Sequence, residues 1–274
     1  MEILVVGDPH GEIPDIGVGK ASVILVTGDV CGDSEVVREA MFDSMDSEKQ
    51  WYDILGRDEA RKAVEKSLQE GLEVLQYLDS FETPVFVVPG NWDWTGDEAW
   101  QFLDKNHFQR LVDDFKNVHN INREIVQDSE FAYIGYGPCP APEIPQYEDE
   151  KPGEQELEEL KKEYREDKSE LEGLFQEAER PVILLSHNVP HGTSLDKIEN
   201  PDSPKDGRHY GSLIVKELIE EERPLLSVAG HMHEGYGEEQ MGETLAINAG
   251  LNSQVTIHVD KDEIKTDFRP LLRK

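Results

Sequence analysis

The chain has 274 residues and carries 59 acidic residues against 27 lysines and arginines, which gives a formal net charge of −32. This length suits one domain with a sizeable core, so we expect a single domain over residues 1–274. The acidic excess argues against a nucleic-acid duplex as the main partner and disfavours anionic membranes, because Lys and Arg supply most of the affinity for both.

The same acidic excess resembles that of proteins from salt-adapted cytoplasms, where counterions screen like-charge repulsion, and it predicts a halophilic protein. No apolar run approaches the roughly 18 residues that span a bilayer, and Met1 leads directly into an apolar strand. We therefore expect neither a membrane segment nor a signal peptide. Cys31 and Cys139 lie far apart and indicate no disulfide framework, so a cytoplasmic location is expected.

In chain order, the first half alternates between apolar runs typical of buried strands and longer polar or amphipathic segments. We expect strands at about residues 2–7, 22–27 and 84–88. After a polar stretch that follows Val30, apolar residues recur every three or four positions over about 58–80, which predicts a helix covering one sheet. Further expected elements are helices around 96–105 and 107–115 and a hairpin that turns at Asp128-Ser129.

Between about residues 138 and 180 the composition changes, since a proline-rich stretch precedes one strongly acidic helical segment with a narrow apolar stripe. This insertion could overhang the strand ends as a cap. It could instead pack on the outer face of a sheet with its acidic side in solvent, which is the interpretation we favour. Neither arrangement requires a separate domain.

The last third returns to alternating helix and strand. We expect a helix after Ser212 and a strand that leads to His231. Strands at about 244–248, 254–259 and 264–268 then follow with short turns, which suggests an antiparallel finish to a second sheet.

Metal-binding residue types recur where five apolar strands end. They are found in Gly7-Asp8-Pro9-His10, Gly28-Asp29, Gly90-Asn91-Trp92-Asp93, Ser186-His187-Asn188 and Gly230-His231-Met232-His233. Ligands of open α/β sheets bind beyond the carboxyl ends of the strands, so these groups are expected at one edge. Carboxylate, amide and imidazole donors suit first-row divalent metals. Seven such donors are too many for one ion that keeps a position open, which predicts a two-metal hydrolase.

This ordered set resembles the calcineurin-like metallophosphoesterases, whose pattern is D-x-H, G-D, G-N-H-[DE], a lone His after a strand, and G-H-x-H. The resemblance spans nearly the whole chain and implies an α/β fold with two mixed β-sheets sandwiched between helices, a four-layer αββα arrangement. It implies one ion held by Asp8, His10, Asp29 and His233, and a second held by Asp29, Asn91, His187 and His231. Asp29 would bridge the two ions, which we expect to be Mn²⁺, with Fe, Zn, Co or Ni as alternatives.

One position departs from the family pattern. The third motif normally carries a histidine after Gly-Asn that is thought to protonate the leaving group, but here the residue is Trp92. His191 and His209 are candidate replacements, although each could be an ordinary loop histidine. Trp92 could form an aromatic wall for a base or aryl group, or simply pack the loop. Arg208 is a candidate phosphate-binding cation, with a surface salt bridge as the alternative.

Together these residues predict an enzyme that hydrolyses small phosphate esters. A hydroxide between two cations would attack phosphorus in line while both ions hold phosphoryl oxygens, so no side-chain nucleophile is required. Catalysis would then depend on Asp29 and Asn91, together with His191 and His209. Monoesters, diesters and nucleotide-type substrates all fit, and the missing imidazole favours diesters with good leaving groups. The alternatives are a non-catalytic protein-binding scaffold of the same fold, or a nuclease, for which the sequence shows no basic track.

Overall fold

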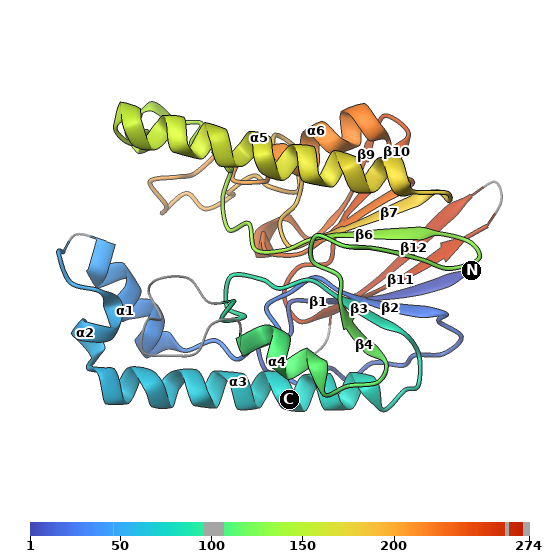
Figure 1. Ribbon diagram of the computed structural model, residues 1–274, viewed down its shortest axis with the longest axis horizontal. Coiled ribbons are helices and arrows are strands. Elements are labelled where there is room, and N and C mark those ends of the chain that lie inside the picture. Colours follow the sequence, from blue (N-terminus) through green and yellow to red (C-terminus); the bar gives the residue numbers. More distant parts are fainter. Residues whose placement is uncertain (46, 96–106, 261–262, 271–274) are drawn as a thin grey trace.

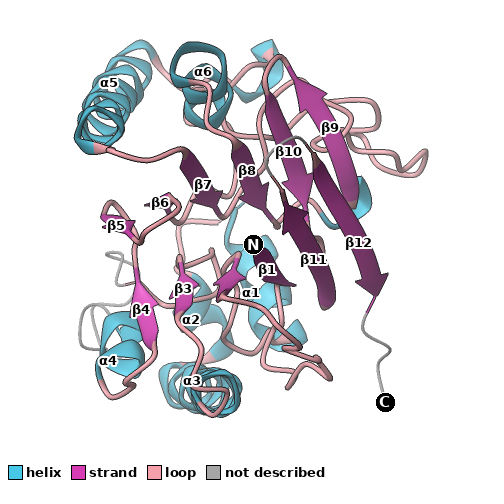
Figure 2. Ribbon diagram, turned by 90° about the vertical axis from the view of Figure 1, so that its right-hand side faces the viewer, coloured by secondary structure: helices cyan, strands magenta, loops and turns pink. Residues whose placement is uncertain are grey.

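The computed structural model describes residues 1–45, 47–95, 107–260 and 263–270. One set of strands comprises β1 (Glu2–Gly7), β2 (Val23–Val26), β3 (Val85–Val87), β4 (Val118–Asn120), β11 (Ser253–Val259) and β12 (Ile264–Pro270). The other comprises β5 (Ile125–Gln127), β6 (Ala132–Tyr136), β7 (Val182–Ser186), β8 (Leu226–Ala229), β9 (Gly237–Met241) and β10 (Thr244–Asn248). They form two mixed six-stranded sheets that face each other, in the orders β12-β11-β1-β2-β3-β4 and β5-β6-β7-β8-β10-β9 (Figure 2).

Helices cover the outer face of each sheet, which confirms the predicted fold (Figure 1). The helices are α1 (Glu35–Met45), α2 (Trp51–Leu55), α3 (Arg57–Asp79), α4 (His107–Asp113), α5 (Glu154–Glu177) and α6 (Leu213–Glu222). Helices α3 and α4 lie below the first sheet in Figure 1, and α5 and α6 lie above the second. None of the helices in the described ranges is both long and apolar enough to cross a membrane.

The alternation of side chains along β1 explains the layers. Ile3 and Val5 point into the core between the two sheets, whereas Leu4 and Val6 pack in a second cluster with α3. All four are buried, since successive side chains of a strand point to opposite faces and both faces of this sheet are covered. An uninterrupted apolar run is therefore the signature of a strand in this fold.

The C-terminal strands correct the expectation of an antiparallel finish to a second sheet. Strand β11 pairs antiparallel with β1 and extends the first sheet, and β12 follows it there. Strand β10 pairs parallel with β8 in the second sheet. The chain crosses between the sheets through Gly250 and Asn252, whose φ angles of 67° and 44° reverse its direction. Periodicity cannot reveal this exchange, because both sheets accept equally apolar strands.

The acidic insertion packs on the outer face of the second sheet, as favoured from its narrow apolar stripe. Leu171 and Phe175 of α5 are buried in a cluster formed with β6, β7 and α6. Two helices that were not expected, α1 and α2, occupy the polar stretch after Val30, at the end of the molecule opposite the amino terminus (Figure 1). The helix expected around 96–105 falls on residues outside the described ranges.

Candidate metal centre

The predicted ligands meet at one edge because the strands that carry them run in parallel. Strands β1, β2 and β3 are parallel neighbours in the first sheet, and β7 and β8 are parallel neighbours in the second. Their carboxyl ends therefore lie on the same side, where ligands of α/β sheets bind. The side chains form two groups able to hold a metal ion, namely Asp8, His10 and His233, and Asp29, His187 and His231.

In the first group, the donor atoms lie within 4.8 Å of one another. His233 Nε2 lies 3.4 Å from Asp8 Oδ2. His10 Nε2 lies 3.5 Å from Asp29 Oδ2, so the Asp29 carboxylate faces this group as well as its own.

In the second group the donor atoms also lie within 4.8 Å of one another, and its residues follow strands of both sheets. His187 Nε2 lies 3.7 Å from Asp29 Oδ2 and 2.9 Å from Asn91 Oδ1. Asp29 thus stands between the two groups, at the position of a bridging ligand. The structure brings together all seven residues that the sequence singled out as metal ligands.

The backbone at these positions is strained. Asp8, His10, Asp29 and His231 have φ angles of 20°, 45°, 49° and 64°. A residue with a side chain pays roughly 1–2 kcal/mol for this left-handed region, and such residues concentrate at functional sites. Gly28, with φ of 106°, has to be glycine, because a Cβ there would lie 2.7 Å from the Gly90 nitrogen. These backbone conformations direct the side chains toward the two donor groups.

The electrostatics of the groups fit a pair of cations. Both ring nitrogens of His10 are buried and lack a hydrogen-bond partner. Burial lowers the pKa of His10 to about 4 and that of His231 to about 3, so both are neutral at pH 7, the form that binds metals. Burial, followed by the charges of Asp8 and Asp93, raises the pKa of Asp29. A bound cation would relieve this cost.

Asp8 behaves differently from Asp29. Burial opposes its ionisation, but the hydrogen bond with His233 and the charge of His187 outweigh that effect and lower the pKa of Asp8 to about 2. Thr27 Oγ1 also donates a hydrogen bond to Asp8 Oδ1 at 2.6 Å. One carboxylate of the centre is therefore held as an anion by its neighbours.

Backbone carbonyls decide which imidazole nitrogen faces a metal. His187 Nδ1 lies 2.8 Å from the Thr27 carbonyl oxygen, and His231 Nε2 lies 3.0 Å from that of Pro140. A carbonyl only accepts hydrogen bonds, so these two nitrogens carry the protons. The unprotonated nitrogens, His187 Nε2 and His231 Nδ1, are therefore the ones whose lone pairs can bind a metal ion. The sequence offered no signal for Thr27 or Pro140, since both act through the backbone carbonyl that every residue has.

The Asn91–Asp93 turn is tied directly to Asp29. The Trp92 backbone N–H donates to Asp29 Oδ1 at 2.7 Å. The Asp93 carboxylate accepts the N–H groups of Cys31 and Gly90, each at 2.8 Å, and burial raises its pKa. Asp93 thus braces the turn from inside, and the partly buried Trp92 ring packs against the cluster that contains Cys31 and Trp94.

His191 and His209 share a carboxylate that sequence reasoning missed. His209 Nδ1 lies 2.7 Å from Asp196 Oδ1, and His191 Nδ1 lies 3.4 Å from Asp196 Oδ2. Asp196 is fully buried and also accepts hydrogen bonds from three backbone N–H groups. Burial opposes its ionisation, but the two imidazoles lower the pKa of Asp196 to about 2. No signal in the sequence indicated this arrangement, because it depends on how the loop between His191 and His209 folds.

This His–Asp–His cluster lies beside the second metal group. Asn188, which directly follows His187, donates its side-chain amide to the Tyr210 carbonyl at 2.9 Å, and Tyr210 directly follows His209.

Arg208 forms ion pairs with residues of the insertion that precedes it in the chain. Its guanidinium forms ion pairs with Asp149 at 2.8 Å and Glu150 at 3.2 Å, and it lies 4.6 Å from the centroid of the Tyr147 ring. The structure therefore places Arg208 in salt bridges, the alternative weighed for it. These contacts anchor the segment that carries Pro140 and the residues after it.

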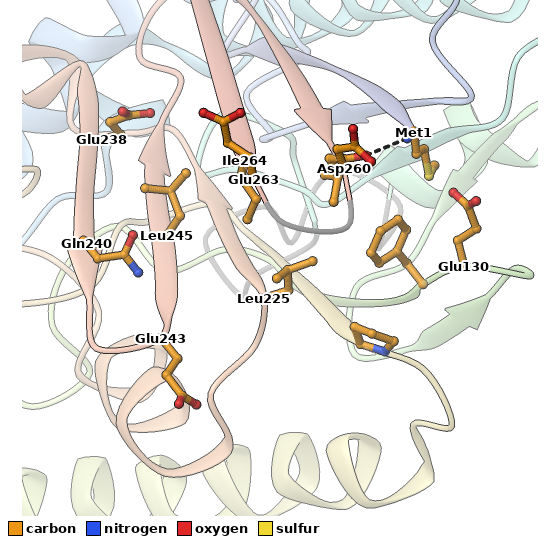
Figure 3. Close-up of a pocket in the computed structure, with 13 residues that line it drawn as sticks. Met1, Glu130, Leu225, Glu238, Gln240, Glu243, Leu245, Asp260, Glu263 and Ile264 are labelled. Atoms are coloured by element: carbon orange, nitrogen blue, oxygen red, sulfur yellow. Dashed lines mark hydrogen bonds between the residues drawn. The ribbon is translucent and has the colours of Figure 1, made fainter.

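A separate cavity of about 950 Å³ lies at the opposite edge of the strands (Figure 3). Met1, Leu225 and Leu245 line it at the amino ends of β1, β8 and β10, and Glu238 and Glu263 stand at its rim. None of the predicted ligands lines it, because ligands follow the carboxyl ends. The donor groups, and not this cavity, locate the candidate site.

The fold resembles that of solved structures. A solved structure matches over 98% of both chains with a TM-score of 0.63 and 19% identity, which shows the fold alone. A phosphopantetheinyl hydrolase from Mycobacterium tuberculosis (12% identity, 90% of this chain and 88% of that chain) and a dimetal phosphatase from Danio rerio (13%, 99% and 96%) each give a TM-score of 0.49. No curated protein matches significantly. The calcineurin-like phosphoesterase family model matches residues 1–235. The chain therefore belongs to the calcineurin-like phosphoesterases and is a metal-dependent phosphoesterase.

Proposed function

We propose that this protein hydrolyses small phosphate esters at a binuclear metal centre, with a preference for diesters, including nucleotide-type esters. The observation that carries the proposal is the meeting of two donor groups at Asp29, whose carboxylate lies 3.5 Å from His10 Nε2 and 3.7 Å from His187 Nε2. One carboxylate between two sets of imidazoles matches the needs of two ions that act on one phosphoryl group.

Each ion has its own set of residues in this proposal. One ion is bound by Asp8, His10, Asp29 and His233, and the other by Asp29, Asn91, His187 and His231. When bound, the ions supply an activated water and positive charge for the phosphoryl oxygens. Mixed oxygen and nitrogen donors support Mn²⁺ as the native ion, with Fe, Zn, Co or Ni as alternatives.

His209 is the proposed proton donor for the leaving group, and His191 is its alternative. Because His209 Nδ1 donates to Asp196, its Nε2 is the atom that can release a proton, as in an oriented acid–base pair. The diester preference belongs to the alternative case, in which no residue replaces the imidazole that the family has at the position of Trp92 and only good leaving groups depart. The Trp92 ring is then available to stack on a base or aryl group.

The expected setting is a salt-adapted cytoplasm. The net charge of −32 supports this, and the two buried free cysteines are compatible with a reducing compartment. The same charge argues against a duplex nucleic acid as substrate.

The test is a metal-reconstituted activity screen. Chelated protein is loaded with Mn²⁺, its metal content is measured, and turnover of bis(p-nitrophenyl) phosphate and p-nitrophenyl phosphate is followed. We expect two ions per chain and faster turnover of the diester. Asp29→Asn should lose a bound ion and at least about 10²-fold in rate, because each ion contributes several kcal/mol of charge stabilisation. The matched control is Asp15→Asn, at an exposed position.

Two outcomes would contradict the proposal. Two bound ions without turnover of any ester would favour a protein-binding scaffold. Full activity in Asp29→Asn would remove the bridging role of this residue.

A further inference from the structure

Arg38 lies on α1 beside the candidate metal centre and has no role in the hydrolysis proposed above. Its guanidinium carbon lies 5.8 Å from the centroid of the Trp92 ring. The Trp92 backbone donates to Asp29 Oδ1 at 2.7 Å. A single tryptophan therefore separates Arg38 from the carboxylate at the middle of the two donor groups.

Arg38 is available to a ligand. Its side chain is 51% exposed, and its partner is the single carboxylate of Asp33. A guanidinium has five N–H donors, so one carboxylate leaves donors for another anion. Arg208, by contrast, is engaged by both Asp149 and Glu150 and is 25% exposed.

We propose that Arg38 binds a second anionic group of the substrate, next to the phosphoryl group that reacts, with the Trp92 ring alongside. The substrates of this class are esters of a diphosphate. This inference rests on the proposed function, because the ions hold the reacting phosphoryl group and Arg38 is offset from them by one indole. A planar guanidinium matches phosphate oxygens in a bidentate manner. In a chain with a net charge of −32, such a cation offsets the repulsion that a second phosphate meets.

The test compares two esters that differ by one phosphate. A nucleoside 5′-diphosphate p-nitrophenyl ester and the corresponding 5′-monophosphate ester share the base and the aryl group. Hydrolysis of the aryl ester bond in either releases p-nitrophenol, whereas cleavage of the diphosphate anhydride releases p-nitrophenyl phosphate, so both products are measured. In the Mn²⁺-loaded protein, Arg38→Gln should lower kcat/KM for the diphosphate ester about tenfold to a hundredfold, as for loss of a charge-assisted hydrogen bond. The loss should fall mainly on KM, and the monophosphate ester should change much less.

The chain offers a matched control in Arg57. This arginine also pairs with one aspartate, Asp53 at 3.1 Å, and its guanidinium carbon also lies near an aromatic ring, 5.2 Å from that of Tyr52. Its partners belong to α2 and not to the turn that carries Trp92. Arg57→Gln should leave the ratio of the two kcat/KM values unchanged. Metal content and thermal unfolding of both variants verify that they are folded.

The outcomes are separable. An equal loss on both esters in Arg38→Gln, or no loss on either, overturns the role of Arg38 while the phosphoesterase assignment stands. A changed ratio in Arg208→Gln together with an unchanged one in Arg38→Gln transfers the role to Arg208. If the wild-type protein releases neither p-nitrophenol nor p-nitrophenyl phosphate from either ester, and no p-nitrophenol from bis(p-nitrophenyl) phosphate, the proposed function itself fails.

Discussion

Trp92 occupies the position at which the family pattern has a histidine, and its surroundings show what the exchange costs. An indole has no acidic proton for a leaving group, while its backbone N–H still binds Asp29. The turn therefore still contacts Asp29 through its backbone, but it has no side chain that can protonate a leaving group.

Restoring the imidazole gives the first prediction. Trp92→His should raise the rate on alkyl phosphate esters at least about tenfold, and that on p-nitrophenyl esters far less, since a positioned general acid contributes about 10²–10⁴-fold and poor leaving groups need it most. Rates over a series of leaving groups measure this. Trp92→Phe controls for loss of the indole. An equal effect on both ester classes would count against a missing acid.

The His209–Asp196 pair gives a second prediction at this scale. If His209 has replaced the family's imidazole, His209→Gln should lower the rate on alkyl esters about 10²-fold and steepen the dependence on leaving-group pKa, because Nε2 would no longer donate a proton, and Trp92→His should then add little. The exposed His258, paired with Glu2 at 3.4 Å on the far strand end, provides the control variant His258→Gln. If His191→Gln reproduces the effect and His209→Gln does not, the donor is His191.

Helix α5 shows how an element with few apolar residues can still be fixed in place. Leu171 is fully buried and Phe175 nearly so, against β6, β7 and α6, while the acidic side remains in solvent. Lys168 adds ion pairs to Glu217 and Glu221 of α6, at 2.8 and 2.9 Å. The hydrophobic stripe, although narrow, therefore carries the attachment of the helix.

A substitution in α5 tests this attachment. Leu171→Ala should lower the free energy of unfolding by about 2–5 kcal/mol, the range for removing a buried leucine side chain. The kcat should not change, because the helix covers the face of the second sheet remote from the first. Denaturant unfolding and activity measure the two effects. Leu157→Ala, at a partly exposed position of the same helix, should cost less. A comparable loss there would mean that Leu171 does not anchor the helix.

At the scale of the whole molecule, the metal centre joins the two sheets. Asp8, His10, Asp29 and Asn91 follow strands of the first sheet, whereas His187, His231 and His233 follow strands of the second. Ions bound here should raise the free energy of unfolding by about 4 kcal/mol per ion at a thousandfold excess over Kd, since they bind the folded chain. Thermal unfolding with Mn²⁺ and with a chelator measures this. An unchanged Tm would contradict it.

The net charge of −32 leads to a second prediction at this scale. Adding KCl to dilute buffer should raise the Tm, with most of the rise below about 0.5 M, because the screening length falls from about 30 Å at 0.01 M to about 3 Å at 1 M. A Tm that rises only above 1 M would instead indicate general salting-out. A Tm independent of salt would contradict self-repulsion as a limit on stability and remove the support for a halophilic origin.

The sequence by itself predicted the strands other than β4 and β9, the fold family and the residues of the candidate metal centre. Strands buried on both faces read as continuous apolar runs, and donor residues directly after them are placed by local chain geometry. Strand β9 was missed because its polar residues, Gly237–Met241, lie at an edge of the sheet and are not buried.

Only the tertiary structure decided the rest. It paired β11 with β1, placed Asp196 between His191 and His209, and set Arg38 against Trp92. It also fixed which nitrogens of His187 and His231 are free, through carbonyls of Thr27 and Pro140. Most of these depend on contacts between residues far apart in the chain, and the placement of Asp196 depends on the fold of an irregular loop. Periodicity and motif spacing record only what neighbours along the chain do, so they carry no information about such contacts.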